Sequence, residues 1–465
     1  MSEGSLRERV LRGGAYLTVR HGLGTVINVA AVLLLTRIVG PGEYGLYAAA
    51  IGAFTAVQLA SQLGLNVFLL RSEEEPGLLL YHQAAMVLLA SGLLLGGIGV
   101  LLAPLIEDVT RLAGLAPLVA VTFVALPVSN LALVPMARME RELEYRSVTW
   151  AELVAQLVFV AVGAPLAFLG WGAWAPLLGW WAQQLAHCLL YHRIAQYRPG
   201  WHYDPALIRR MLHHGVGYSA SLWLWQLRRL VNPFVVGRFL GAEAVAFVAV
   251  ATQIVTHLSF VANATWRLGT SALARVRHDA ERTMKAINEG MPLQILVVAP
   301  FLVAFGLVAQ WAVPALLGRD WTTLARVYPY IAVAYTTIAA FNLHCSALYV
   351  RGLHARISIY HVAHVVLLLG AALLLVPRFG LIGYGYAELI NLASFLVLHL
   401  VVARDIGDAS YGAMLPLWAA TALLLFHQQL GVLAFTGALL LVLWSRPWRA
   451  VRGVMAGLRG AYAFE

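Results

Sequence analysis

Long apolar stretches recur along the whole chain and are separated by short polar segments. A helix needs about 20 apolar residues to cross the hydrocarbon core of a bilayer. Stretches of this size predict fourteen spans, the last two the shortest, at 14–36, 45–69, 79–104, 115–137, 148–169, 172–195, 214–238, 245–268, 291–317, 324–350, 356–376, 381–403, 411–427 and 430–445. The alternation that marks strands is absent, so we expect an all-α polytopic membrane protein.

The composition supports this assignment to the membrane. Hydrophobic residues make up 61% of the 465 residues and charged residues only 12%, against about 25% in soluble domains. So few charges cannot cover a water-exposed globule. Cys188 and Cys345 both lie in apolar runs, which argues against a disulfide framework or a thiolate metal site. The basic, polar N-terminus precedes a stretch long enough to span, so we expect no cleaved signal peptide.

The cationic residues predict the orientation. The formal charge of +10 comes from 31 arginines and Lys285. With both termini in the cytoplasm, the inner segments hold 22 of these 32 cations and the outer segments hold five. Inner loops of membrane proteins carry such an excess. We therefore expect a multi-pass protein of a bacterial or archaeal cytoplasmic membrane, with both ends inside.

The loops leave little room for chemistry outside the membrane. Each outer loop has under about a dozen residues, so an extramembrane catalytic domain is excluded on the connection lengths. Phosphate-binding glycine loops, zinc-protease motifs, serine-hydrolase elbows and paired carboxylates are all missing from the sequence. We expect a transporter with no catalytic residue, no metal and no cofactor.

An internal similarity predicts two related halves. The segment TRIVGPGEYGLYAAA begins at Thr36, and GRFLGAEAVAFVAVA begins at Gly237. Each joins the first and second helix of a six-helix set, as in transporters built from repeats. We expect an N-terminal bundle at 1–197, a second at 198–405, and two further helices with a basic tail at 406–465.

Charged and polar residues inside the spans mark the candidate substrate site. Arg20 and Asn28 lie in the first span, and Arg228 and Arg229 lie about four turns into the seventh. An arginine near the bilayer centre costs about 2.5–3.5 kcal/mol on insertion scales, so it should face water or a partner. For Arg20, about 9 Å from the inner end at 1.5 Å per residue, snorkelling to the interface is an open alternative.

The seventh span adds an aromatic, an amide and a helix breaker. Trp225 and Asn232 share a face with the arginines. Pro233 lacks the amide that would bond to the carbonyl of Arg229, so we expect a bend that acts as a gate or hinge. An ordinary proline kink is the alternative. The positive lining suits a phosphate or pyrophosphate group, which arginine binds bidentately.

Groups that could carry protons are scarce in the spans. Glu388 is one of two evident membrane carboxylates and is a possible coupling residue. His361 and His364 have a spacing compatible with metal, but no further ligand completes a set, so we expect hydrogen-bonded packing.

Several segments together resemble the Wzx-type polysaccharide and O-antigen flippases of the multidrug/oligosaccharidyl-lipid/polysaccharide (MOP) exporter superfamily. They are LLLTRIVGPGEYGLYAAA, MERELEYRSVTWAELVAQ, GWGAWAPLLG, NPFVVGRFLGAEAVA and FGLIGYGYAELI. The resemblance implies two six-helix bundles around a central cavity, and alternating access that flips an undecaprenyl-pyrophosphate-linked oligosaccharide from the inner to the outer leaflet. Members often have an acid where Asn232 stands, and Gly-Tyr where Ala246 and Phe247 stand.

Alternative functions remain open at this point. The same frame serves lipid II flippases and small-molecule exporters. A membrane-embedded polysaccharide polymerase or acyltransferase is a further alternative, although the sequence lacks a large outer loop and a clustered acid/base pair. A flippase would have the lipid-linked glycan and the bilayer as partners, and would associate functionally with a glycan polymerase and glycosyltransferases. Nothing in the sequence indicates nucleic-acid binding.

Overall fold

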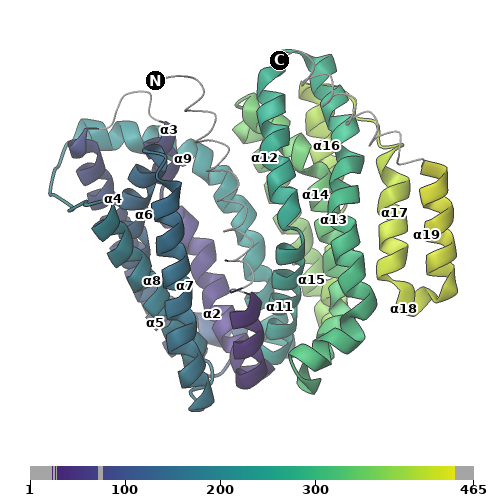
Figure 1. Cartoon of the computed structure of the whole chain (residues 1–465), viewed down its shortest axis with the longest axis horizontal. Coiled ribbons are helices and arrows are strands. Elements are labelled where there is room, and N and C mark those ends of the chain that lie inside the picture. The colour runs from purple at the N-terminus through teal and green to yellow at the C-terminus, as the bar shows by residue number, and fades with distance from the viewer. Residues whose placement is uncertain (1–23, 25–26, 28, 72–76, 446–465) are drawn as a thin grey trace. The chain divides into compact units, whose positions relative to one another are not determined.

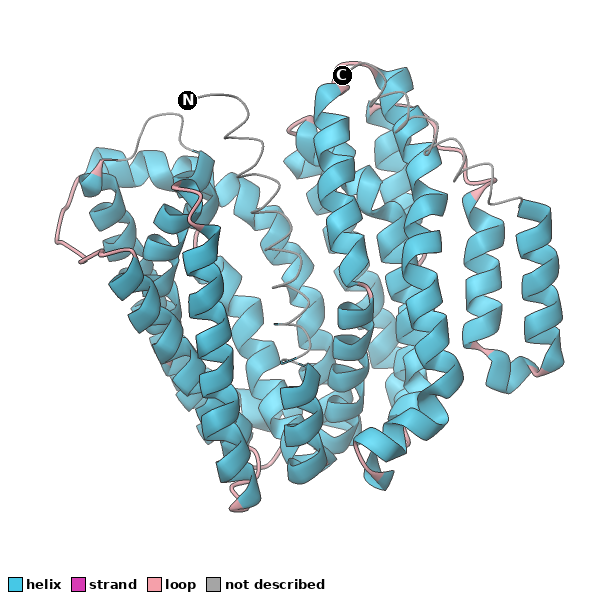
Figure 2. Cartoon of the chain, in the orientation of Figure 1, coloured by secondary structure: helices cyan, strands magenta, loops and turns pink. Residues whose placement is uncertain are grey.

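The computed structural model describes residues 24, 27, 29–71 and 77–445. These residues form helices joined by short loops, with no strand among them, as the all-α prediction requires (Figure 2). The first helix is described over Val29–Val39. The others are α2 (Pro41–Ser61), α3 (Leu65–Arg71), α4 (Leu78–Thr110), α5 (Leu115–Val124), α6 (Leu126–Arg141), α7 (Tyr145–Phe168), α8 (Trp174–Ile194), α9 (Pro205–Gln226), α10 (Arg238–Leu240), α11 (Ala242–Leu258), α12 (Phe260–Arg275), α13 (Ala280–Leu316), α14 (Leu324–Val350), α15 (His354–Asn391), α16 (Ser394–Asp405), α17 (Met414–Leu425), α18 (His427–Leu430) and α19 (Val432–Ser445).

Within the described part of the chain, six helical stretches are long and apolar enough to cross a membrane. They are Leu78–Thr110, Leu115–Arg141, Tyr145–Phe168, Ala280–Leu316, Leu324–Val350 and His354–Asp405. Shorter apolar helices lie at Val29–Val39, Ala242–Leu258, Met414–Leu425 and Val432–Trp444. Each predicted span overlaps one or more of the described helices, the first of them only over its described residues, and the count of fourteen crossings stays a prediction.

The stretch His354–Asp405 contains a sharp reversal at Gly380, which separates the two spans predicted there. Gly380 has φ +61° and ψ −141°, a non-helical conformation that glycine adopts without strain because it lacks a Cβ. A Cβ at Gly383 would overlap the carbonyl oxygen of Leu375 and lie 2.6 Å from its carbonyl carbon. Residues eight apart in a straight helix are about 12 Å apart at 1.5 Å per residue. The chain therefore folds back on itself at this glycine.

The chain forms two compact units, Met1–Ala246 and Phe247–Glu465. The boundary falls inside α11, so α9, α10 and the start of α11 pack with the first unit. In the second unit, α17 and α19 pack side by side and α18 joins them (Figure 1). The division at 197 and 405, which rests on the internal similarity and not on packing, stays a prediction.

The two faces of helix α4 differ in a way that suits a helix packed against protein on one side and lipid on the other. Its glycines allow close packing, and a Cβ at Gly99 would overlap the ring of Phe123 on α5. Small residues at such contacts are typical of helix packing in membranes. The opposite side carries exposed leucines, and Leu101 is 81% exposed. In a bilayer that apolar face meets acyl chains at no hydrophobic cost.

Charged side chains close helix ends in the first unit. A carboxylate oxygen of Glu43, on α2, accepts the Ala173 N–H at 2.9 Å, at the start of α8. The guanidinium of Arg238 donates through Nη1 to the carbonyl oxygen of Val109, 2.7 Å away in the last turn of α4. An anion at a helix N-terminus and a cation at a helix C-terminus both interact favourably with the helix dipole, so both contacts stabilise these helix ends.

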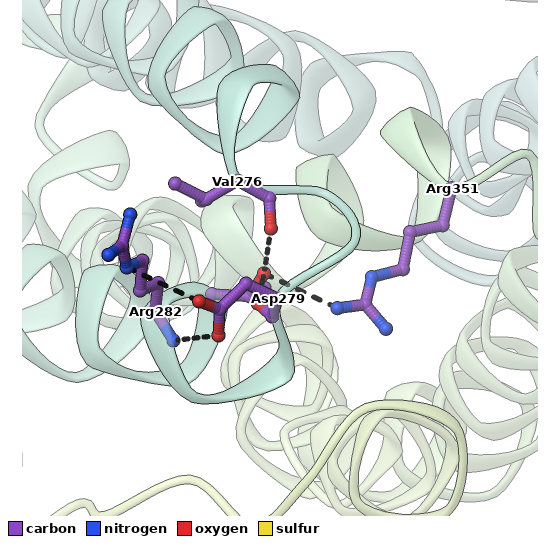
Figure 3. A network of polar contacts seen from close by, with 5 residues as sticks. Val276, Asp279, Arg282 and Arg351 are labelled. Carbon is purple, nitrogen blue, oxygen red and sulfur yellow. Dashed lines mark hydrogen bonds and ion pairs between the residues drawn. The ribbon is translucent and has the colours of Figure 1, made fainter.

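In the second unit, a polar network joins two of the predicted inner loops (Figure 3). The Arg351 guanidinium donates to Thr283 Oγ1 at 3.3 Å. That hydroxyl lies 3.1 Å from the carbonyl oxygen of Val276 and 2.7 Å from that of Asp279. The Asp279 carboxylate in turn pairs with Arg282 Nε at 3.2 Å. Arg351 therefore holds the segment after α14 against the start of α13, where the Asp279–Arg282 pair is a local contact.

Candidate functional site

The predicted seventh span is an interrupted helix, as its proline requires. Regular α-helix ends at Gln226, a 3₁₀ turn covers Leu227–Leu230, and a π-helical turn covers Asn232–Gly237. Pro233 is buried in the π-helical turn. It cannot donate to a carbonyl one turn earlier, so the regular ladder cannot pass through it. Mid-helix 3₁₀ and π segments are often found at functional sites.

Both arginines of the span lie in the 3₁₀ turn, and each has a neighbour that orients it. The guanidinium carbon of Arg228 lies 4.6 Å from the centre of the Trp225 ring, a cation–π contact. Arg229 Nε donates to Gln226 Oε1 at 3.0 Å, and its side chain is exposed. The local structure thus brings two cations, one indole and one amide together within five residues.

Asn232 lies one turn further on, at the start of the π segment. Its Nδ2 donates to the carbonyl oxygen of Val245 at 3.1 Å, so it ties the broken helix to α11. Its Oδ1 is buried and accepts no hydrogen bond from the described residues. A buried amide oxygen without a donor costs free energy and is suited to an incoming donor or cation.

Helix α2 packs against this break. A Cβ at Gly52 would lie 3.7 Å from Pro233 Cγ and 4.0 Å from the carbonyl oxygen of Arg229. That carbonyl is the one whose partner amide Pro233 removes. Arg20 and Asn28, the other predicted substrate residues, lie outside the described residues. Gln226 is a site residue that the sequence analysis missed, although its position three residues before Arg229 on a helix is a signal for such a pair.

Glu388 lies in the second unit, on the second arm of α15. It is 6% exposed, and Oε1 accepts a hydrogen bond from the Tyr384 hydroxyl at 2.7 Å. One turn later, Asn391 Nδ2 lies 2.8 Å from His364 Nε2, and Ser394 Oγ lies 2.8 Å from His364 Nδ1. The ring of His364 is thus bonded on both sides, which confirms hydrogen-bonded packing for this histidine.

Two further histidines, the buried His344 and the half-buried His399, meet at one tyrosine. The Tyr411 hydroxyl lies 3.2 Å from His344 Nε2 on α14 and 2.9 Å from His399 Nδ1 on α16. Tyr411 precedes α17, so this contact attaches the C-terminal helices to the rest of the second unit. Among the described residues, no group of three or more His, Cys, Asp or Glu side chains could hold a metal ion.

The two similar loops have the same backbone. Gly40 has φ 79° and ψ 165°, and Gly241 has φ 83° and ψ −178°. In each loop the glycine N–H bonds to the carbonyl oxygen four residues earlier, at 3.1 Å and 2.9 Å. The loops also touch, because a Cβ at Gly45 would overlap the Ala242 oxygen and lie 2.5 Å from its carbonyl carbon. The two loops therefore share one backbone geometry, whereas the repeat of two six-helix halves stays a prediction.

The fold is similar to that of transporters of known structure. The lipid II flippase MurJ in an inward closed conformation superposes with a TM-score of 0.70 and 11% identity, over 95% of this chain and all of that one. An inward-facing multidrug resistance MATE family transporter of the MOP superfamily gives 0.67 and 14% identity, over 82% and 94%. The fold therefore resembles that of these two transporters.

The sequence comparisons narrow this class to a family. A family model described as polysaccharide biosynthesis protein matches residues 34–326. Lipopolysaccharide biosynthesis protein WzxC of Escherichia coli (strain K12) is 22% identical over 340 residues, 71% of this chain and 67% of that protein. Amylovoran biosynthesis protein AmsL of Erwinia amylovora is 23% identical over 143 residues, 30% and 37% of the two chains. The chain belongs to the polysaccharide biosynthesis protein family.

Proposed function

We propose that this protein flips an undecaprenyl-pyrophosphate-linked oligosaccharide from the inner to the outer leaflet of the cytoplasmic membrane by alternating access. Family membership supports a lipid-linked glycan as the cargo. The pair Arg228 and Arg229, placed at a helix break in a predicted span, is the observation that carries the headgroup assignment. In this role the two guanidinium groups neutralise the pyrophosphate while it crosses.

The physical case rests on charge and on orientation. Each arginine near the bilayer centre costs about 2.5–3.5 kcal/mol on insertion scales, and that cost is offset when an anion is bound. Guanidinium groups form short, paired hydrogen bonds with phosphate oxygens. Trp225 and Gln226 restrict the two side chains before the ligand arrives, which lowers the entropy lost on binding. Arg228 covers one face of Trp225, so a sugar ring would stack on the other face.

The remaining predicted site residues complete the proposal. Arg20 and Asn28 contribute from the first span, and Asn232 presents its buried amide oxygen to a hydroxyl donor of the passing sugar. Pro233 is the hinge, because the broken hydrogen-bond ladder beside it can change its bend at low cost. Glu388 carries the coupling proton. An arginine cannot do so, since its guanidinium is always charged.

The test replaces Arg228 and Arg229 together with alanine. We expect surface glycan display to be lost while the amount of protein in the membrane stays unchanged. Lysine at both positions keeps the charge and should restore display only in part, because lysine cannot bind phosphate bidentately. Arg319→Ala, an exposed arginine of a predicted outer loop, is the matched control and should leave display unchanged. Normal display in the double alanine variant would refute the pyrophosphate role.

A lipid II flippase is the second candidate function, because the MurJ fold covers 95% of this chain. Proteoliposomes distinguish the two functions when they are loaded either with undecaprenyl-pyrophosphate oligosaccharide or with lipid II. Export of small molecules is tested in the same vesicles with a fluorescent cation. Association with a polysaccharide polymerase or glycosyltransferases belongs to the proposal, and chemical crosslinking in native membranes tests it.

A further inference from the structure

The segment that joins α8 to α9 is clamped onto the first unit. We call residues 195–213 the connector; it includes the first turns of α9, which begins beside α3 (Figure 1). His82 Nδ1 on α4 accepts the Gly200 N–H at 2.9 Å and lies 3.3 Å from the Tyr197 hydroxyl. Gln83 Oε1 accepts the Asp204 N–H at 2.7 Å. The backbone of the connector is thus fixed at two points.

Tyr197 strengthens this attachment from inside the unit. It is buried, and its ring centre lies 6.4 Å from that of Tyr81 and 5.7 Å from that of His82. Burial raises the pKa of the Tyr197 phenol far above its usual value, although the charge of Arg138 opposes the shift. The phenol therefore stays neutral and keeps its proton. One face of the connector therefore packs against the first unit, and its other face is exposed.

The start of α9 is amphipathic. Asp204 caps it by accepting the N–H groups of Ala206 and Leu207 at 2.9 Å and 3.2 Å. Leu207 and Met211, one turn apart, pack into the apolar core of the unit. Positions three and four residues apart on the other side are exposed, namely Ala206, Arg209, Arg210 and His213. The side chains of two adjacent arginines are therefore exposed on this face of the helix.

Two large aromatic side chains project from the loop just before this helix. Trp201 is 85% exposed and Tyr203 is 71% exposed. Nearly complete exposure to water is unfavourable for such rings, whereas the headgroup region of a bilayer accommodates both the ring and its polar atom. The connector carries three arginines and one aspartate, and the aspartate is used as a cap. Its outer face therefore combines aromatic rings with a net positive charge.

We propose that the connector is a binding site for anionic phospholipid headgroups, with Trp201 and Tyr203 at the interface and Arg209 and Arg210 on the lipid phosphates. Aromatic rings beside cations are the features that hold a helix at an anionic bilayer surface. The predicted topology places this segment on the inner side, so the ligand is an inner-leaflet lipid such as phosphatidylglycerol. The site is separate from Arg228 and Arg229 and does not depend on which cargo is transported.

Lipid bound at this site would anchor α9, the helix that leads to the break beside Arg228 and Arg229, to the bilayer surface. Lipid bound at Arg209 and Arg210 fixes the first turns of α9, and the same helix runs on to the break at Leu227. When the segment after the break moves, the start of α9 then stays fixed at the lipid surface. We therefore expect flipping rates to depend on the content of anionic lipid.

The test places a fluorescent reporter on the exposed stripe. In full-length protein with Cys188→Ala and Cys345→Ala, Ala206→Cys is labelled with an environment-sensitive dye and reconstituted in vesicles of phosphatidylcholine with or without phosphatidylglycerol. We expect a blue shift that grows with phosphatidylglycerol, and quenching by lipids spin-labelled near the headgroup. Each arginine near an anionic surface contributes roughly fivefold to binding, so Arg209→Gln with Arg210→Gln should remove the dependence on phosphatidylglycerol.

Two further variants make the result specific. Trp201→Ser with Tyr203→Ser should reduce quenching by the spin-labelled lipids. Arg275→Gln with Lys285→Gln removes the same charge from exposed positions in the second unit, and should leave the reporter signal unchanged. The proposal is overturned if dye emission is the same in both kinds of vesicle, or if this control pair abolishes the shift as well. Neither readout requires transport, so failure here is distinguishable from failure of the proposed function.

Discussion

The contact between the two similar loops gives the sharpest test of the fold. A methyl group at Gly45 would overlap the carbonyl oxygen of Ala242 and lie 2.5 Å from its carbonyl carbon. Since real Cβ contacts are rarely below 3.4 Å and the oxygen is nearer still than the carbon, α2 and α11 would have to separate by more than about 1 Å. Three residues earlier on the same helix, a Cβ at Gly42 would meet only Glu243 Cγ, at an ordinary 3.9 Å.

The two alanine variants should therefore differ in stability. Alanine in a helix is favoured over glycine by roughly 0.5–1 kcal/mol, and this gain is shared by both variants. Overpacking against backbone costs about 1–3 kcal/mol and applies only to Gly45→Ala. We expect Gly45→Ala to unfold about 1–3 kcal/mol more easily than Gly42→Ala.

Unfolding in mixed detergent and SDS micelles, followed by tryptophan fluorescence, measures this difference. Glycan display in cells gives a second readout, which Gly42→Ala should leave at the level of the unmodified protein. Equal unfolding midpoints for the two variants, or a stabilised Gly45→Ala, would show that the two loops do not meet as described.

Two further predictions concern the second unit. Gly380→Ala should destabilise the protein by about 1–3 kcal/mol, because φ +61° with ψ −141° is strained for alanine. Gly370→Ala lies in open space in the helical part of α15 before the reversal and should instead stabilise the protein by roughly 0.5–1 kcal/mol. Equal melting temperatures for the two variants would contradict the reversal at Gly380. Glu388→Gln keeps an acceptor for Tyr384 but cannot carry a proton, so flipping in proteoliposomes should stop responding to an imposed pH gradient, whereas Tyr384→Phe should still respond. A response to the gradient in Glu388→Gln would exclude the coupling role.

The sequence predicted the bounds of some helices closely and those of others poorly, and the difference has a physical reason. The predicted span 324–350 matches α14 (Leu324–Val350), because polar segments end the apolar stretch on both sides. By contrast, the predicted span 291–317 became α13 (Ala280–Leu316), eleven residues longer at its start. Apolarity reports where a helix is inside lipid, whereas the helix itself continues as long as its backbone bonds are favourable. The Asp-Pro pair at Asp204 and Pro205, a cap and a first helical residue, was a missed signal for an earlier start of α9.

The candidate site shows the same limit. Contacts within one helix follow from spacing, so Trp225, Arg228 and Arg229 could be grouped from the sequence. Partners from distant segments could not be foreseen, such as the carbonyl of Val245 for Asn232, or Gly200 for His82.

The order of residues was thus sufficient for the all-α membrane class, the apolar stretches, the broken seventh helix and the family resemblance. These depend on local properties, namely apolar length, proline chemistry and helical periodicity. Only the tertiary structure decided which helix ends are capped by distant charges and which face of the connector points outward. It also decided where two backbone segments come so close that only glycine fits. Those features arise when segments far apart in the chain compete for the same space and the same hydrogen bonds, and no single stretch of sequence contains that information.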